Sequence, residues 1–88
     1  MKYNYIKIGN FSEEYLNSGY KQKINELIKS IDENGLLKGI GKPEYLKYKK
    51  VYSRRINDKD RLLYTILKDT KTIALISCQG HYNDHWLL

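Results

Sequence analysis

Glu44, His81 and a group of arginines are the residues of this chain best suited to chemistry. Glu44 begins a basic stretch of the sequence, and His81 follows the last apolar stretch. A carboxylate can accept a proton, an imidazole can donate one, and arginines stabilise negative charge that develops on a phosphate. These groups together are sufficient for metal-free cleavage of RNA by its own 2′-hydroxyl. The competing interpretation is structural, because a single histidine after a strand is more often structural than catalytic.

A metal centre is poorly supported by the same region. His81 and His85 have the i, i+4 spacing that would let two imidazoles share a metal on a helix. Only Asp84 stands nearby as a third ligand, and Gly80 and Asn83 disfavour a helix there. We therefore expect neither a metal nor another cofactor. A decoy and a second proton carrier stay open as roles for His85, and we favour a spectator.

The positive charge is concentrated in residues 37–61. The chain has a net charge of +6, and this window holds nine basic and three acidic residues, while the rest of the chain is neutral. Such a focused field favours a polyanion or an acidic protein as partner. A solvated lysine face is the alternative, but Arg54, Arg55 and Arg61 favour phosphate, because the guanidinium fork matches its geometry. The interleaved tyrosines suit unstacked RNA bases as well as ordinary strands.

Length and composition limit the class of protein. Eighty-eight residues support one domain, and 41% hydrophobic residues are too many for a disordered chain. No apolar run approaches the roughly 20 residues of a membrane span, and the N-terminus lacks the apolar region of a secretion signal. We therefore expect a cytoplasmic protein with no membrane partner. The only cysteine, Cys78, ends an apolar stretch and is expected to be a buried, inert thiol.

The first half of the chain predicts a strand followed by two helices. Residues 3–8 alternate and are rich in Tyr and Ile, which is typical of a strand. Ser12 is expected to begin a short helix that ends near Asn17, with two glutamates in its first turn. A second helix is predicted from residue 20 to Gly35, because Ile24, Leu27, Ile28 and Ile31 form one apolar stripe.

The second half predicts antiparallel strands over residues 51–56, 61–67 and 72–78, with turn-like residues between them. A further strand is expected over residues 45–49. The fold class is therefore α+β, an N-terminal strand and two helices packed on a mainly antiparallel sheet. The helical stripe must bury itself against one sheet face, which leaves the opposite face open for a functional site.

Side chains alternate between the two faces of a strand, so neighbouring arginines point in opposite directions. We expect Arg55 and Arg61 to face the site and Arg54 to be exposed to solvent. A register shift of one residue would reverse this assignment.

Several blocks of the sequence, in this order and spacing, form a recognisable pattern. They are residues 23–29, 39–47, 52–57 and 61–64 and the final His81-Tyr82. The chain thereby resembles the YoeB/Txe toxins of the RelE superfamily over roughly residues 20–82. The Gly-Lys-Pro-Glu and Ser-Arg-Arg-Ile blocks with the terminal His-Tyr carry this resemblance together.

The resemblance implies a RelE-like fold, similar to small microbial ribonucleases, as a single domain over residues 1–88. It implies a toxin of a type II toxin–antitoxin module that acts as a metal-independent endoribonuclease, or mRNA interferase. Such a toxin cleaves mRNA in the ribosomal A site, contacts 16S rRNA and thereby inhibits translation. The implied partners are a YefM/Axe-like antitoxin and a second copy of the chain in a homodimer.

The resemblance also implies residue roles. Glu44 would be the general base for the 2′-hydroxyl and His81 the general acid for the leaving 5′-oxygen. Arg61 would stabilise the pentacoordinate phosphate, and the first product would be a 2′,3′-cyclic phosphate. The remaining positions would bind or place the substrate: Lys47, Arg55 and Tyr82.

Residues 83–88 depart from the family pattern as a C-terminal extension, whose Trp-Leu-Leu end is expected to pack on the body or on a partner. Two alternative functions stay open. One is a gyrase-directed toxin of the ParE kind, against which Glu44, Arg61 and His81-Tyr82 together argue. The other is a non-catalytic module that binds RNA or the ribosome.

Overall fold

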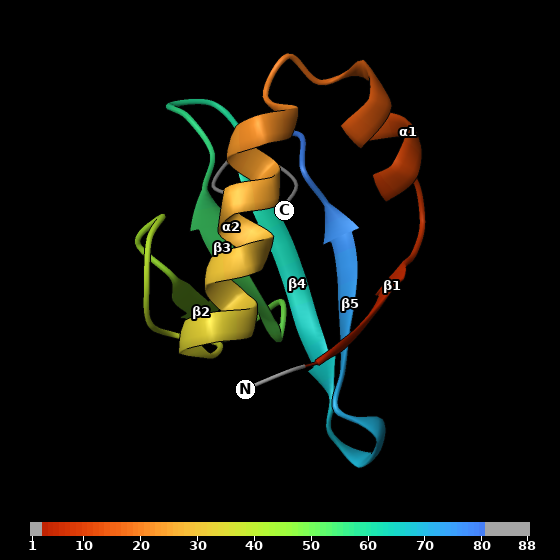
Figure 1. Cartoon of the computed structure of the whole chain (residues 1–88), viewed down its shortest axis with the longest axis vertical. Coiled ribbons are helices and arrows are strands. Elements are labelled where there is room, and N and C mark those ends of the chain that lie inside the picture. Colours follow the sequence, from red (N-terminus) through yellow and green to blue (C-terminus); the bar gives the residue numbers. More distant parts are fainter. Residues whose placement is uncertain (1–2, 81–88) are drawn as a thin grey trace.

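The structure, a computed structural model, describes residues 3–80 and shows two helices on a five-stranded sheet (Figure 1). The elements are β1 (Asn4–Lys7), α1 (Phe11–Asn17), α2 (Lys21–Asn34), β2 (Glu44–Leu46), β3 (Val51–Arg55), β4 (Arg61–Leu67), the 3-10 turn η1 (Lys68–Thr70) and β5 (Thr72–Ser77). The strand order is β1-β5-β4-β3-β2; β1 is parallel to β5 and every other pair is antiparallel. The predicted α+β class is confirmed.

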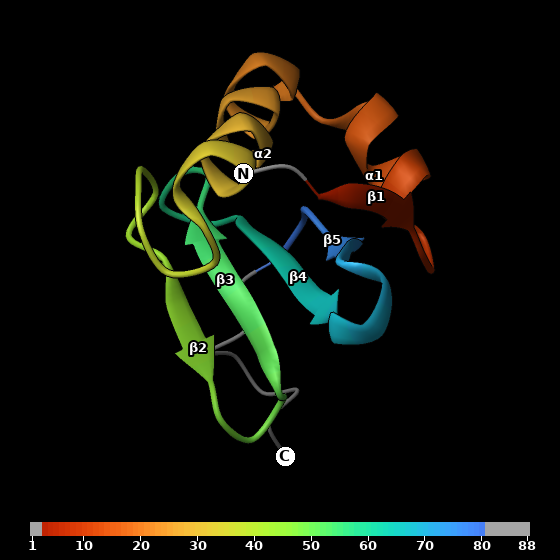
Figure 2. The same ribbon diagram turned by 60° about the horizontal axis from the view of Figure 1, so that its bottom comes forward.

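Helix α2 carries the apolar stripe that the sequence predicts. Ile24, Leu27 and Ile31 are fully buried against the sheet. The helix ends where expected, because Gly35 adopts φ +95° and its N–H still donates to the carbonyl of Ile31 at 2.9 Å. Figure 2 shows α1 and α2 on the same side of the sheet, so the helices leave the other face uncovered.

Helix α1 begins one residue before the expected position. Phe11, not Ser12, is the first residue of the helix; Asn10 precedes it, and no side chain caps it. The reason is tertiary packing, because Phe11 is buried in the core at the helix start. Glu14, in the first turn, instead accepts hydrogen bonds from the Ser77 hydroxyl and the Cys78 N–H, each at 2.9 Å.

The predicted strands after residue 50 are confirmed to within a residue at each end. The expected strand over residues 45–49 is displaced, since β2 covers only Glu44–Leu46. Residues 47–50 instead form the turn to β3, in which the Lys50 N–H donates to the Leu46 carbonyl at 2.7 Å. Within the described residues, no helix is long and apolar enough to cross a membrane.

The two faces of the sheet support different clusters. Leu62 and Tyr64 pack with the helices in the main core, while Leu63, between them, joins Leu46 in a small cluster on the other face. Side chains of β4 therefore alternate between the two faces of the sheet. The small cluster lies next to the candidate site, and Leu46 belongs to both.

We expect Leu27→Ala to reduce the free energy of unfolding by about 2–5 kcal/mol, because it leaves a cavity under α2. Leu16→Ala is the matched control: Leu16 lies on α1 and is 66% exposed, so its truncation should cost less than about 0.5 kcal/mol. Urea unfolding followed by circular dichroism measures both values. Equal losses for the two variants would contradict the packing described here.

Candidate active site

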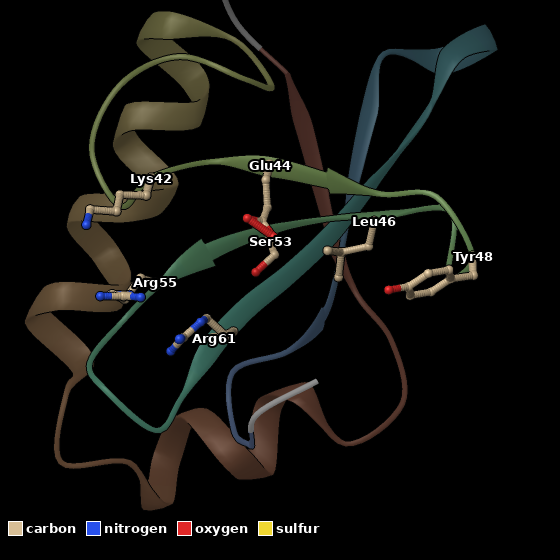
Figure 3. Close-up of a pocket in the computed structure, with 7 residues that line it drawn as sticks. All are labelled: Lys42, Glu44, Leu46, Tyr48, Ser53, Arg55 and Arg61. Atoms are coloured by element: carbon tan, nitrogen blue, oxygen red, sulfur yellow. The ribbon is translucent and has the colours of Figure 1, made fainter. Parts of the chain in front are cut away.

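A cavity of about 350 Å³ lies on the sheet face that the helices leave uncovered (Figure 3). Residues from β2, β3, β4 and the adjoining loops line it: Lys42, Glu44, Leu46, Tyr48, Ser53, Arg55 and Arg61. The lining combines one carboxylate with three cations. The predicted open face therefore holds a polar, mainly basic pocket.

Arg55 and Arg61 face each other directly across the β3–β4 pair, which places both on the pocket side of the sheet. Figure 3 shows both arginine side chains among the residues that line the pocket, one from β3 and one from β4. Like charges opposite one another on two strands repel, so the backbone pairing must hold them together. Two guanidinium forks directed at one cavity make a suitable receptor for a phosphate.

The Arg61 side chain is fixed by the hairpin turn between β3 and β4. Its Nη1 donates to the carbonyl of Asn57 at 2.7 Å and to that of Asp60 at 3.1 Å, and the residue is only 7% exposed. The turn is itself organised by the Asn57 side-chain oxygen, which accepts from the N–H groups of Lys59 and Asp60. The guanidinium is therefore held in place before any ligand binds.

Glu44 is the first residue of β2 and pairs with Ser53 of β3. Ser53 is buried, whereas Glu44 is exposed at the edge of the sheet. Figure 3 shows the Glu44 carboxylate directed towards Ser53, on the same side of the sheet as Arg55 and Arg61. The predicted carboxylate and two of the predicted cations are thus brought together.

Four residues that line the pocket were not predicted as site residues: Lys42, Leu46, Tyr48 and Ser53. Lys42, Glu44, Leu46 and Tyr48 are spaced by two in the sequence. Only Glu44 and Leu46 lie in β2, so strand alternation would have found Leu46 but not the two residues in the flanking loops. Lys47 lies one position out of this series. It is exposed in the turn after β2 and is not among the lining residues, so its role in substrate binding stays a prediction.

The expectation that Arg54 is exposed is wrong. Alternation does direct it away from Arg55, but α2 and the loop after it cover that face, and Arg54 is fully buried. Hydroxyl and carbonyl oxygens surround its guanidinium, which makes burial of the charge possible.

His81 and Tyr82 lie outside the described residues, as does the extension over residues 83–88. The described chain ends at Gly80, whose carbonyl accepts from the Arg61 N–H at 3.2 Å. The Gly80 N–H donates to a carboxylate oxygen of Asp60 at 2.9 Å. The chain that leads to His81 is therefore held beside a residue of the pocket. Among residues 3–80, no group of three or more His, Cys, Asp or Glu could hold a metal.

Comparison with known protein families shows to which family this chain belongs. Residues 12–82 match the model of the YoeB-like toxin of bacterial type II toxin–antitoxin systems. The chain belongs to the YoeB family. It is therefore a toxin of a type II toxin–antitoxin system, as the sequence resemblance implies.

Individual YoeB proteins are similar over most of the chain. The YoeB dimer from Staphylococcus aureus is 45% identical, with a TM-score of 0.79 over 93% of this chain and 100% of that one. The S. aureus YoeB–YefM heterotetramer gives 44% identity and a TM-score of 0.76 over the same shares of the chains. Toxin YoeB of Synechocystis sp. is 46% identical over 63 residues, which cover 69% of this chain and 70% of the relative.

This YoeB-family toxin has one cysteine, and it is buried as predicted. Burial, assisted by the nearby Glu14 and Asp60 carboxylates, raises the pKa of Cys78 from its ordinary value of 9.0 to about 12. The thiol therefore stays protonated at neutral pH, and the thiolate is the reactive form.

We expect Cys78 to resist alkylation by iodoacetamide in the folded protein. At pH 8 a thiol with a pKa of about 12 is ionised in roughly one molecule in ten thousand. Labelling should become fast in denaturant, where the pKa returns to its ordinary value, and mass spectrometry measures both rates. Comparable rates in the two states would contradict the buried placement.

Proposed function

We propose that this toxin cleaves mRNA on the ribosome through attack of a ribose 2′-hydroxyl on the adjacent phosphate. The observation that carries the proposal is the pocket itself, in which Glu44 lies on the same open face as Arg55 and Arg61. A proton acceptor beside two cations, one of them held in place by the β3–β4 turn, is what this reaction needs around one phosphodiester. No step of the proposed reaction requires a metal.

In the proposed reaction, Glu44 accepts the proton of the 2′-hydroxyl as its oxygen forms a bond to phosphorus. Arg61 stabilises the charge of the pentacoordinate phosphate, and Arg55 assists it. The bond from phosphorus to the 5′-oxygen then breaks, and His81 donates a proton to that oxygen. The products are a 2′,3′-cyclic phosphate and a free 5′-hydroxyl, so atoms and protons balance.

Other residues would place the RNA. Lys42, which lines the pocket, and Lys47, in the exposed turn beside it, suit phosphates that flank the scissile one. Tyr82 is proposed to hold a base by stacking. Dependence on the ribosome is physically reasonable, because a fixed codon geometry supplies proximity worth up to about 7–11 kcal/mol in favourable cases.

The proposed partners follow from the relatives. One S. aureus structure is a heterotetramer of YoeB with YefM, and another is a YoeB dimer. We propose that this toxin likewise binds a YefM-like antitoxin and forms a homodimer. A net charge of +6 favours an acidic segment in such an antitoxin.

We expect Glu44→Gln to slow cleavage about 10²–10⁴-fold, because it removes the general base and keeps the side-chain size. The assay is cell-free translation of a defined mRNA, with 5′ ends mapped by primer extension. Wild-type protein should cut inside codons in the A site. The matched control is Glu26→Gln, at an exposed position on α2, which should leave cleavage unchanged.

The same assay separates the alternative functions when DNA supercoiling and binding of the toxin to ribosomes are measured beside it. Intact mRNA with inhibited DNA supercoiling would identify a gyrase-directed toxin. Intact mRNA with toxin bound to ribosomes would identify a passive binding module. Either result, or full activity of Glu44→Gln, would overturn the proposed reaction.

We expect Arg55→Ala to weaken binding of a short single-stranded RNA. The slope of the logarithm of the binding constant against the logarithm of salt concentration should fall in magnitude by about one. Arg55 is exposed in the pocket, so the change should leave the fold intact. Titration by fluorescence anisotropy at several salt concentrations measures the slope. Lys21→Ala, at the start of α2, is the control, and an equal loss in both variants would exclude a specific phosphate site.

A further inference from the structure

Arg54 is the largest side chain that the described structure buries completely. A guanidinium has five N–H donors, and each has one acceptor here. Nε donates to the Tyr64 hydroxyl at 2.8 Å, Nη1 to the Ser30 hydroxyl at 3.0 Å and to the Ile40 carbonyl at 2.8 Å. Nη2 donates to the Gly35 and Lys38 carbonyls at 2.8 and 2.7 Å. The buried charge is thus fully hydrogen-bonded.

The three carbonyl acceptors belong to one segment, the loop of residues 35–43 that leaves the C-terminus of α2. That helix has no basic residue in its last turn. Arg54 supplies the missing cation from the sheet, where the negative end of the helix dipole favours it. Tyr64 extends the network, because its hydroxyl donates to the Leu36 carbonyl at 2.7 Å. Burial raises the pKa of Tyr64, so this donor keeps its proton.

The loop also fits closely around Arg54. Gly39 and Gly41 have φ values of +105° and +87°, which disfavour other residues. A Cβ at Gly39 would clash with the Ser30 hydroxyl, and one at Gly41 would lie 2.6 Å from a Leu27 methyl and 3.1 Å from the Arg54 Cβ. Contact with Arg54 and with α2 therefore fixes the path of this segment.

The same segment delivers two residues to the pocket. The Gly41 carbonyl accepts from the Arg55 N–H at 2.7 Å, Lys42 follows at once, and Glu44 begins β2. Figure 2 shows this loop passing the end of β3 before it becomes β2. Strand β2 has only three residues and, among residues 3–80, pairs with β3 alone, so its own pairing holds Glu44 weakly.

We infer that Arg54 is a positioning residue for Glu44 and Lys42: from the covered face, it fixes the loop that brings both residues to the pocket on the opposite face. The inference rests on the proposed role of Glu44 as general base. It assigns different tasks to adjacent arginines, since Arg55 faces the phosphate site and Arg54 holds the backbone.

The test is Arg54→Lys, which keeps the charge but offers at most three donors for five acceptors. On ribosomes programmed with mRNA we expect kcat to fall about 10–100-fold with little change in KM, because a displacement of about 1 Å can cost 10²-fold. Amide hydrogen exchange in residues 36–42 should accelerate. The control is Ile73→Val, a core change on β5, which two strands separate from β2. It should lower the melting temperature without changing kcat or the hydrogen exchange of residues 36–42.

A double-mutant cycle separates positioning from general damage. In a Glu44→Gln background, Arg54→Lys should cause much less further loss of kcat, because the group that it positions is already gone. An equal loss in both backgrounds, or unchanged loop exchange in Arg54→Lys, would overturn the inference.

The outcome also distinguishes this inference from the proposed function. If Glu44→Gln is fully active, the proposed reaction fails, and the role of Arg54 towards a catalytic base fails with it. If Glu44→Gln is inactive but Arg54→Lys keeps its kcat, only the present inference fails. Should Arg54→Lys not fold, Tyr64→Phe removes the acceptor of Nε and the donor to Leu36, and the same exchange and kcat outcomes apply.

Discussion

Two adjacent arginines on one strand impose the main constraint on this fold. Alternation sends Arg54 to the face that the helices cover and Arg55 to the open pocket. A guanidinium stays charged under all ordinary conditions, so its burial is costly unless every donor has an acceptor. The end of α2 and the loop after it must therefore lie where their carbonyls reach Arg54. The position of β2, and with it the edge of the pocket, follows from that requirement.

The pocket shows the complementary constraint. Paired strands hold Arg55 and Arg61 next to each other although their charges repel, and the turn carbonyls fix the Arg61 side chain. The fold thus keeps positive charge at the pocket, where it attracts an anionic ligand. Preorganised charge of this kind needs little rearrangement when the negative charge of a reaction develops, which suits phosphate chemistry.

Local patterns in the sequence predict much of this structure, and the failures have physical causes. The stripe of α2 and the alternation that brings Arg55 and Arg61 together are local properties. The burial of Arg54 depends on carbonyls of an irregular loop, and the start of α1 depends on the packing of Phe11 in the core. Neither leaves a periodic signal in the sequence. The predicted roles of His81 and Tyr82 concern residues outside those that the structure describes.

The parallel pairing of β1 with β5 joins the first and last strands of the described residues, with Asn4 opposite Thr72. Parallel neighbours so distant in sequence close a long loop, and such contacts form late and slowly. A nascent chain cannot complete this pairing until β5 has been synthesised. The sheet is consequently completed only after Thr72–Ser77 has been synthesised, so a growing chain that ends before β5 does not yet present the complete fold.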